Sequence, residues 1–272
     1  HPDLFAASIP EALEKAGPGY NSMIDAASGF SIGVVIAGGF SWFFGYLGGQ
    51  PQLSMRFMAI SDVRQAKKAR HTGIIWTIFA YIGALSIGWL GIAIFGPGTL
   101  ADQETVMPEV LLTIFPPAIA AILITGAIAA MVSTADSLLI LSSTEFSENL
   151  LKPALKKKVS DKKNLMLSRL VTASLAVIAL IVAYISPSDL IYTLVGYVWA
   201  GIGANFSVVI LLTLFWKKFH GRAALITIIA GVAFTIIWIT TGMDEVITAR
   251  IMTFVVALLV AICSTLILKE NK

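Results

Sequence analysis

AILITGAIAAMVSTADSLLILSSTE, residues 121–145, is a segment long and apolar enough to cross a lipid bilayer. Part-way along its length it carries four polar side chains, those of Ser133, Thr134, Asp136 and Ser137. Lipid offers such groups no hydrogen-bond partners, so we expect them to face other helices or a water-filled cavity. The segment therefore predicts a membrane-spanning helix with a polar, functional side.

The polar residues of this segment share one side of the predicted helix. Ala130, Ser133, Thr134 and Ser137 follow the i, i+3, i+4, i+7 spacing of a helix face. Hydroxyl oxygens, and backbone carbonyls wherever the helix loosens, suit a small hard cation such as Na⁺. Asp136 is the only one of the sixteen acidic residues that falls well inside an apolar span. We expect it to anchor a neighbouring helix rather than to titrate in the ion path.

The composition excludes a soluble protein. Apolar residues make up 57% of the chain, charged residues only 13%, and the mean hydropathy is +0.85. A soluble domain carries about 25% charged residues. Each predicted span has roughly the ~20 residues needed to cross the hydrocarbon core. The seven spans cover residues 26–48, 72–95, 117–143, 166–186, 190–216, 222–241 and 247–268.

Basic residues are distributed unevenly between the segments that connect these spans. One alternating set of segments holds seventeen of the nineteen Lys and Arg residues, and the other holds only Lys15 and Arg250. By the positive-inside rule the basic set is cytoplasmic, which predicts an external N-terminus and a cytoplasmic C-terminus. The basic run 156–158 lies between two spans, so we expect no nucleic-acid partner.

Two connecting segments carry further information. The chain begins with His1, and residues 1–25 have the proline and glycine content of an external loop. We therefore expect a fragment whose earlier spans are missing. Residues 99–115 mix acidic and apolar side chains. That mixture fits a helix lying on the outer membrane surface and a plain connecting loop equally well.

The first predicted span, residues 26–48, is rich in glycine and contains two aromatic residues four apart, Trp42 and Tyr46. Glycine pairs such as Gly38-Gly39 weaken a helix. A broken helix with aromatic rings beside it can bind a small zwitterion near the bilayer midplane. The alternative is a close-packing glycine face with aromatic anchors at the cytoplasmic interface. The residues alone leave both interpretations open.

Three motifs resemble one family of membrane proteins. GYLGGQPQLSMRFMAI, residues 45–60, resembles the pattern GY-x-GQP-x-x-x-x-RFMA of the sodium:solute symporter family, most closely its sodium/proline symporters. AAMVSTADSLLILSS, residues 129–143, resembles that family's A-x-MSTADS-x-LL-x-x-SS segment. GYVWAGIGANFSVVILLTLFW, residues 196–216, is similar to a third, glycine-rich signature. The resemblance extends from about Gly29 to Phe219.

The resemblance implies a fold. It is all-α and polytopic, with two five-helix repeats of inverted topology, as in leucine-transporter-type proteins. Of the seven transmembrane helices predicted here, the first five would form the second repeat, core helices six to ten, over residues 26–217. Residues 1–25 would be an external loop segment, and residues 218–272 would form two peripheral helices. The first repeat would be the missing part.

The resemblance also implies two sites. In the family, the coupling Na⁺ lies between core helices one and eight. The residues that match its ligands are Ala130 (by its carbonyl), Ser133 and Thr134. The residues that match the solute site of core helix six and its cytoplasmic end are Trp42, Tyr46, Gln50 and Pro51. We expect Asp136 and Ser137 to support the cation site without touching the ion.

The chain departs from the family pattern at three places. Val132 interrupts the family's MST, so that the chain reads Met131-Val132-Ser133-Thr134, and the helical face of Ala130, Ser133 and Thr134 is kept. The chain also has one residue more than GY-x-GQP, because Gly48-Gly49 precedes Gln50. It also reads FSVV at residues 206–209, where the proline symporters commonly read FGPVVL. Without that Gly-Pro pair, the helix should be more regular at this point.

The predicted function is secondary active transport, in which Na⁺ drives the symport of a small solute. Proline, or a related amino acid or organic acid, is the foremost candidate. We expect no enzyme activity, since no base lies near Ser133 in the sequence, and no organic cofactor. The expected partners are the solute, membrane lipid and the missing N-terminal repeat, in the plasma (inner) membrane. A membrane sensor derived from the same fold is the alternative.

Overall fold

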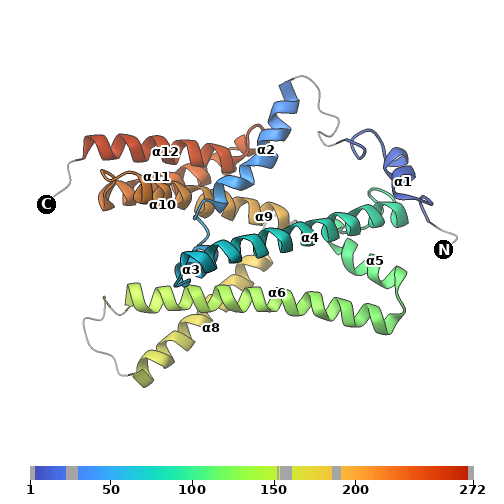
Figure 1. Ribbon diagram of the computed structural model, residues 1–272, viewed down its shortest axis with the longest axis horizontal. Helices are drawn as coiled ribbons and strands as arrows, with labels where there is room; N and C mark the ends of the chain where they lie inside the picture. The colour runs from blue at the N-terminus through green and yellow to red at the C-terminus, as the bar shows by residue number, and fades with distance from the viewer. Residues whose placement is uncertain (1–3, 23–29, 152, 154–160, 186–190, 269–272) are drawn as a thin grey trace. The chain divides into compact units, whose positions relative to one another are not determined.

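The computed structural model describes residues 4–22, 30–151, 153, 161–185 and 191–268, which form helices joined by short connections (Figure 1). Six of these helices are long and apolar enough to cross a membrane. They are α4 (Val63–Phe95), α6 (Pro117–Glu145), α8 (Asp161–Ile185), the continuous helix α9–η3–α10 (Ile191–Phe215), α11 (Gly221–Thr240) and α12 (Ala249–Ile267). The prediction of a helical, multi-pass membrane protein is confirmed.

The structure describes the first predicted span only from Phe30 onward. The 17 described residues of its helix α2 (Phe30–Tyr46) are too few to count as a span by themselves, so the seventh span stays a prediction. Residues 26–29 of that prediction lie outside the described part. α2 runs unbroken through Gly38-Gly39. The chain breaks after Tyr46 instead, where Gly48 has a φ of +100° that favours glycine, and α3 (Pro51–Met58) follows.

Glycine and proline residues mark the ends of the connection between α4 and α6. α4 ends at Phe95, and Gly96 beyond it has a φ of +81°. The acidic and apolar segment that follows is helical, with η1 (Gln103–Thr105) and α5 (Val106–Ile114), so the helical alternative holds for most of it. α6 begins with Pro117, at a first helical position that needs no backbone N–H. The turn predicted at residues 186–189 lies outside the described residues.

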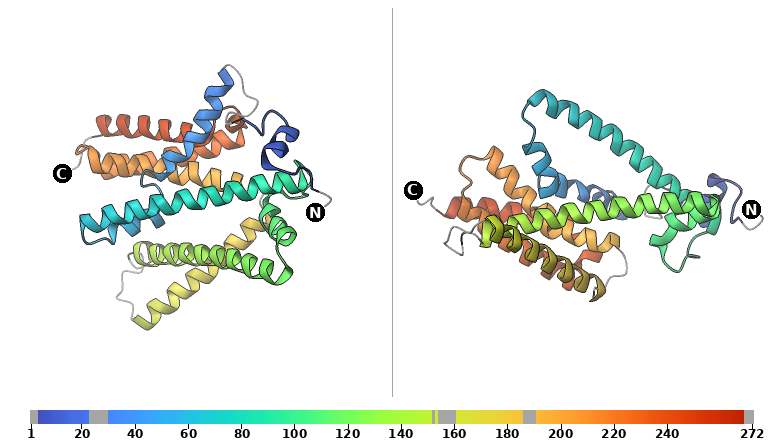
Figure 2. Two further views of the ribbon diagram at one scale, coloured as in Figure 1. Left: turned by 45° about the vertical axis from the view of Figure 1, so that its right-hand side comes forward. Right: turned by 90° about the horizontal axis from the view of Figure 1, so that it is seen from below.

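The chain divides into two compact units, each described here by itself. One unit comprises residues 108–189, in which α8 crosses α6, and α6 is continued by the π-helix η2 (Phe146–Leu151) (Figure 1). The other comprises residues 1–107 and 190–272. In it α11 and α12 lie side by side, and α12 also packs on α2 and on η3 (Trp199–Ala204) (Figure 2).

Small residues at every fourth position explain the close packing of α11 and α12. The buried ridge of α11 consists of Ala223, Thr227, Gly231 and Thr235. The buried ridge of α12 consists of Ala249, Thr253, Ala257, Ala261 and Thr265. Lipid tails are as apolar as leucine, so helices in a membrane associate through close packing and hydrogen bonds rather than hydrophobic exclusion. The ridges permit both, because the hydroxyls of Thr235 and Thr253 lie 2.7 Å apart where they meet.

The N-terminal segment, predicted as an external loop, contains the short helix α1 (Ile9–Ala16). Ser8 accepts a hydrogen bond from the Glu11 amide, and the Glu11 carboxylate accepts one from the Ala7 amide. The hydrogen bond from Lys15, 2.7 Å away, holds the pKa of Glu11 below its usual value. α1 packs on α4, and the amide of Phe5 donates to the carbonyl of Ile94 at 3.2 Å.

The junction between α2 and α3 packs directly on the π-helix η3. A Cβ added at Gly49 would overlap the backbone carbonyl of Gly203, and a Cβ added at Gly45 would overlap the ring of Trp199. The backbone of the junction can therefore approach η3 only where these positions have no side chain. This contact determines where α3 starts relative to the helix α9–η3–α10.

We predict that Gly49→Ala destabilises the protein, because the new methyl group meets backbone that cannot rotate away. Overpacking of this kind costs about 1–3 kcal/mol or more. The control is Gly39→Ala in α2, where a Cβ meets nothing within 4 Å. Thermal unfolding in detergent should show a lower midpoint for Gly49→Ala and an unchanged or higher one for Gly39→Ala. Equal midpoints would contradict the observed junction.

Candidate functional site

The two aromatic residues predicted from the first span belong to a larger aromatic group. Trp199 of η3 lies between them, with its ring centroid 5.7 Å from that of Trp42 and 4.8 Å from that of Tyr46. Tyr192 of α9 adds a fourth ring, 5.4 Å from Trp42. All three pairs are tilted or edge-on, as aromatic side chains prefer. We refer to Trp42, Tyr46, Tyr192 and Trp199 as the aromatic group.

Glycine and two hydrogen bonds hold this group in place. Gly45 lies between the two α2 aromatics and leaves the space that the indole of Trp199 fills. The Nε1 of Trp199 donates to the backbone carbonyl of Trp42 at 3.0 Å. The Nε1 of Trp42 in turn donates to the hydroxyl of Tyr192 at 3.3 Å. Trp42 is half-buried and Tyr46 is 51% exposed, so the group presents an accessible aromatic surface.

Gln50 and Pro51 lie at the junction, outside the aromatic group. Gln50 is 5% exposed, and within the described residues its side-chain Nε2 has no hydrogen-bond partner. That nitrogen lies beside Gly203, where an added Cβ would be 2.8 Å away. Pro51 is exposed and is the first residue of α3. The structure thus brings Gln50, but not Pro51, into the packed interior between α2 and η3.

Two of the three departures from the family pattern meet in space. The amide of Gly49, part of the additional Gly48-Gly49 pair, donates to the hydroxyl of Ser207 at 3.1 Å in the buried interior. Ser207 belongs to the segment that replaces the Gly-Pro pair, and the helix is regular there, as predicted. The distortion lies directly before it, in η3, and was not foreseen. A buried amide left without an acceptor would cost about 1–3 kcal/mol, so Ser207 compensates for the additional glycine.

A basic residue that the sequence analysis did not select completes the surroundings of Trp42. The guanidinium carbon of Arg250, from α12, lies 4.4 Å from the centroid of the Trp42 ring. Its Nε donates to the hydroxyl of Ser41 at 2.7 Å. One signal was available: Arg250 is one of only two basic residues on the charge-poor side of the predicted topology. Tyr192 and Trp199 had no such signal, since aromatic residues are common in spans.

The predicted cation residues lie on one accessible face of α6. Ala130, Ser133 and Thr134 are all exposed in this chain. The hydroxyl of Thr134 donates to the carbonyl of Ala130 at 3.1 Å, which places two of the proposed oxygen ligands side by side. The helix is regular through these residues and does not unwind. From these three residues, α6 by itself can therefore offer a cation only the hydroxyls of Ser133 and Thr134 and the carbonyl of Ala130. That carbonyl already accepts a hydrogen bond from Thr134.

The two supporting residues share the exposure of this face. Ser137 donates its hydroxyl to the carbonyl of Ser133 at 2.8 Å, in the same pattern as Thr134 one turn earlier. Asp136 is exposed and, among the residues that the structure describes, it forms no ion pair. An ionised carboxylate in this position is costly against lipid. The face therefore requires a polar cover that this unit does not itself provide.

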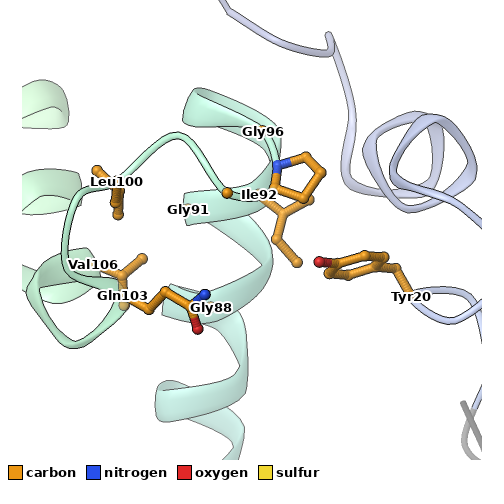
Figure 3. Close-up of a pocket in the computed structure, with 10 residues that line it drawn as sticks. Tyr20, Gly88, Gly91, Ile92, Gly96, Leu100, Gln103 and Val106 are labelled. Carbon is orange, nitrogen blue, oxygen red and sulfur yellow. The ribbon is translucent and has the colours of Figure 1, made fainter. Parts of the chain in front are cut away.

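A cavity of about 210 Å³ opens beside the C-terminal part of α4. Gly88, Gly91 and Ile92 form one wall, and the side chains of Tyr20 and Gln103 extend along its edges (Figure 3). None of the predicted site residues lines it. Its lining has no charged side chain, and its polar side chains are those of Tyr20 and Gln103.

Comparison with known proteins agrees with the three motifs. Residues 18–231 match the family model described as "Sodium:solute symporter family". The chain is 38% identical over 222 residues to the "High-affinity proline transporter PutP" of Bacillus subtilis (strain 168). It is 35% identical over 225 residues to the "Osmoregulated proline transporter OpuE" of the same strain. It is 36% identical over 205 residues to the "Sodium/proline symporter 2" of Staphylococcus saprophyticus.

These matches cover most of the chain but less than half of each relative. The aligned parts are 81%, 82% and 74% of this chain, and 46%, 45% and 40% of the three relatives. No solved structure gives a significant match. The resemblance to sodium/proline symporters is confirmed, and the named relatives give no support to the membrane-sensor alternative. The family model covers well over half of the residues, and the chain therefore belongs to the sodium:solute symporter family.

Proposed function

We propose that this chain supplies the second repeat and two peripheral helices of a Na⁺-coupled symporter for a small solute, foremost proline. Residues 26–217 form core helices six to ten in this proposal, and residues 218–272 form the peripheral pair. The observation that carries it is the aromatic group, because Tyr46 of one family motif and Trp42, just before that motif, both contact Trp199 of another family motif. The named functions of the relatives support the same solute.

The aromatic group offers what a small amino acid with an apolar ring requires. Its rings supply an apolar aromatic surface, and the unpaired side-chain amide of Gln50, four residues after Tyr46, is a free hydrogen-bond donor. Solute sites of this kind combine mostly apolar walls with a few fixed polar groups. Tyr46 contributes both an aromatic face and a hydroxyl.

The exposed face of α6 suits the other half of a cation site. The oxygens of Ala130 and Thr134 already lie 3.1 Å apart, and the hydroxyl of Ser133 lies on the same face. Three oxygens are fewer than a Na⁺ site needs, so a second element must complete it. We propose that the first repeat of the transporter, absent from this chain, provides the remaining ligands and also covers Asp136. Ion binding and solute binding would then favour the same conformational state.

The orientation proposed from the basic residues can be tested by labelling. In a Cys263→Ala background, a cysteine at Ala101 or Thr240 should react with an impermeant thiol reagent in intact cells. A cysteine at Ser160 should react only after the cells are opened, since the positive-inside rule places this segment in the cytoplasm. External labelling at Ser160 would reverse the proposed topology.

For the cation, we predict that Ser133→Ala and Thr134→Ala, made in the complete transporter, each raise the Na⁺ concentration for half-maximal uptake. Loss of a direct ligand should raise it by roughly ten- to a hundred-fold. Thr125→Ala is the matched control, because Thr125 is an exposed α6 threonine with the same hydroxyl-to-carbonyl bond, at 2.7 Å. The measurement is solute uptake against Na⁺ concentration, corrected for surface expression. An unchanged Na⁺ dependence in both variants would remove the site from α6.

The carboxylate of Asp136 could either anchor a covering helix or take part in the ion path, and one substitution distinguishes these two roles. If it anchors a covering helix, Asp136→Asn should lower the folded yield in membranes while the Na⁺ dependence of the remaining protein stays close to wild type. A large change in Na⁺ affinity at normal yield would instead place the carboxylate in the ion path. Size-exclusion profiles in detergent, together with the uptake assay, distinguish the two.

For the solute, Trp42→Ala and Tyr46→Ala should raise the apparent KM for proline far more than that for Na⁺. Trp76→Ala in α4 is the control, because that indole is 73% exposed and belongs to no aromatic pair among the described residues. Tyr46→Phe then shows whether the hydroxyl or the ring matters. If the substitutions lower expression and leave the KM alone, these residues are interfacial anchors and the solute binds elsewhere.

A further inference from the structure

Arg250 is the second residue of α12 and is half-buried, and two contacts hold its side chain. Its Nε donates to Ser41, a fully buried hydroxyl of α2, and this hydroxyl donates in turn to the backbone carbonyl of Gly38. Its guanidinium carbon lies over the Trp42 ring, 4.4 Å from the ring centroid. A cation over an indole is attracted by the negative face of the ring. These contacts orient the guanidinium, but they do not neutralise it.

No acidic residue compensates the charge of Arg250 in the described part of the chain. The ion pair recorded there joins Lys15 and Glu11. Lys15 and Arg250 are the two basic residues in the segments that hold few charges. Lys15 has a carboxylate partner among the described residues, and Arg250 has none. Among the same residues the guanidinium has a recorded acceptor for its Nε, but none for its two Nη groups. An arginine held at Nε with both Nη groups unpaired can still bind an anion.

The neighbouring helix leaves room for those Nη groups. A Cβ added at Gly196, in α9, would lie 2.7 Å from Nη1 of Arg250, and Gly196 is buried. The glycine thus creates the space in which the end of the guanidinium sits, between α9 and Trp42. Arg250 itself is only half-buried, so a small ligand on the aromatic group could reach it.

We propose that Arg250 binds the carboxylate of the solute, with the aromatic group packing against the solute's apolar ring. The inference rests on the proposed solute site and narrows its ligand to small monocarboxylates with an apolar ring or chain. A planar guanidinium matches a carboxylate with two parallel hydrogen bonds, which a neutral amide cannot reproduce. The site should therefore prefer an acid over the amide of the same shape.

The test measures binding directly and does not depend on transport. The complete transporter, purified in detergent with fixed Na⁺, is titrated with two matched pairs by calorimetry. The pairs are proline with prolinamide, and cyclopentanecarboxylate with cyclopentanecarboxamide. Arg250→Met should weaken binding of each carboxylate by about ten- to a hundred-fold, the usual effect of losing a charge-assisted hydrogen bond. It should change binding of the amides by no more than about two-fold.

Two further variants provide a control and a second probe. Arg222→Met is the matched control, because Arg222 is exposed and, like Arg250, is the second residue of its helix. Gly196→Ala displaces the guanidinium without removing it, since the methyl group meets the flexible end of a side chain. It should reduce the preference for carboxylates as well. Arg250→Lys keeps the positive charge and should retain part of the preference for carboxylates over amides. It therefore shows whether a loss in Arg250→Met reflects the missing charge or a misfolded protein.

The outcomes separate this inference from the proposed function. If Arg250→Met weakens acids and amides equally, Arg250 only supports Trp42 and the carboxylate contact is wrong. A wild-type protein that binds acids no better than amides in either pair also overturns it. If the preference for acids depends on Arg250 but Na⁺-driven uptake of proline is absent, the carboxylate site stands and the proposed transport function fails.

Discussion

The central constraint on this structure is that lipid cannot hydrogen-bond to a polar group. Every backbone amide within a span must therefore find its acceptor inside the chain, and each hydroxyl either bonds back to its own helix or meets another helix. The structure follows this constraint closely. Thr134, Ser137 and Thr227 each donate to the carbonyl four residues earlier. Where the pattern of a helix is interrupted, as at Gly49, a side chain from another helix supplies the missing acceptor.

Close packing follows from the same constraint, since hydrophobic exclusion does not drive helices together in lipid. The unit of residues 1–107 and 190–272 uses small residues for this purpose throughout. The ridges of α11 and α12 bring two helices into contact, Gly45 accommodates the indole of Trp199, and Gly49 lets the α2–α3 junction touch η3. Gly45 thereby positions the ring of Trp199, and Gly49 lets two backbones approach each other. The aromatic group around Trp42 is a consequence of this packing.

Two of the three departures from the family pattern, at Gly48-Gly49 and at Ser207, contact each other in the structure. An additional residue at Gly48-Gly49 leaves an amide in the buried interior, and a hydroxyl at Ser207 accepts its hydrogen bond. Read separately, each departure weakens the resemblance to proline symporters. In the structure the two lie together, at the point where the junction between α2 and α3 packs on η3.

Several properties were determined by the sequence alone. Composition and span length were sufficient to identify a multi-pass membrane protein, and three motifs were sufficient to identify the family. Gly96, Pro116 and Pro117 marked the end of α4 and the start of α6. These are local or additive properties, so a linear reading can find them. The break in the first predicted span could not be placed in the same way, because α2 runs through Gly38-Gly39 and the chain turns at Gly48 instead.

Only the tertiary structure decided which residues meet. It joined Trp42 and Tyr46 through Trp199, separated Pro51 from Gln50, and placed Arg250 of the last helix on Trp42. These contacts join residues more than 150 positions apart in some cases, as between Trp42 and Trp199 or Ser41 and Arg250. No periodicity or motif encodes such a distance, because it results from the packing of several helices at once. The sequence therefore identified the family, and the packing of its helices selected the members of the site.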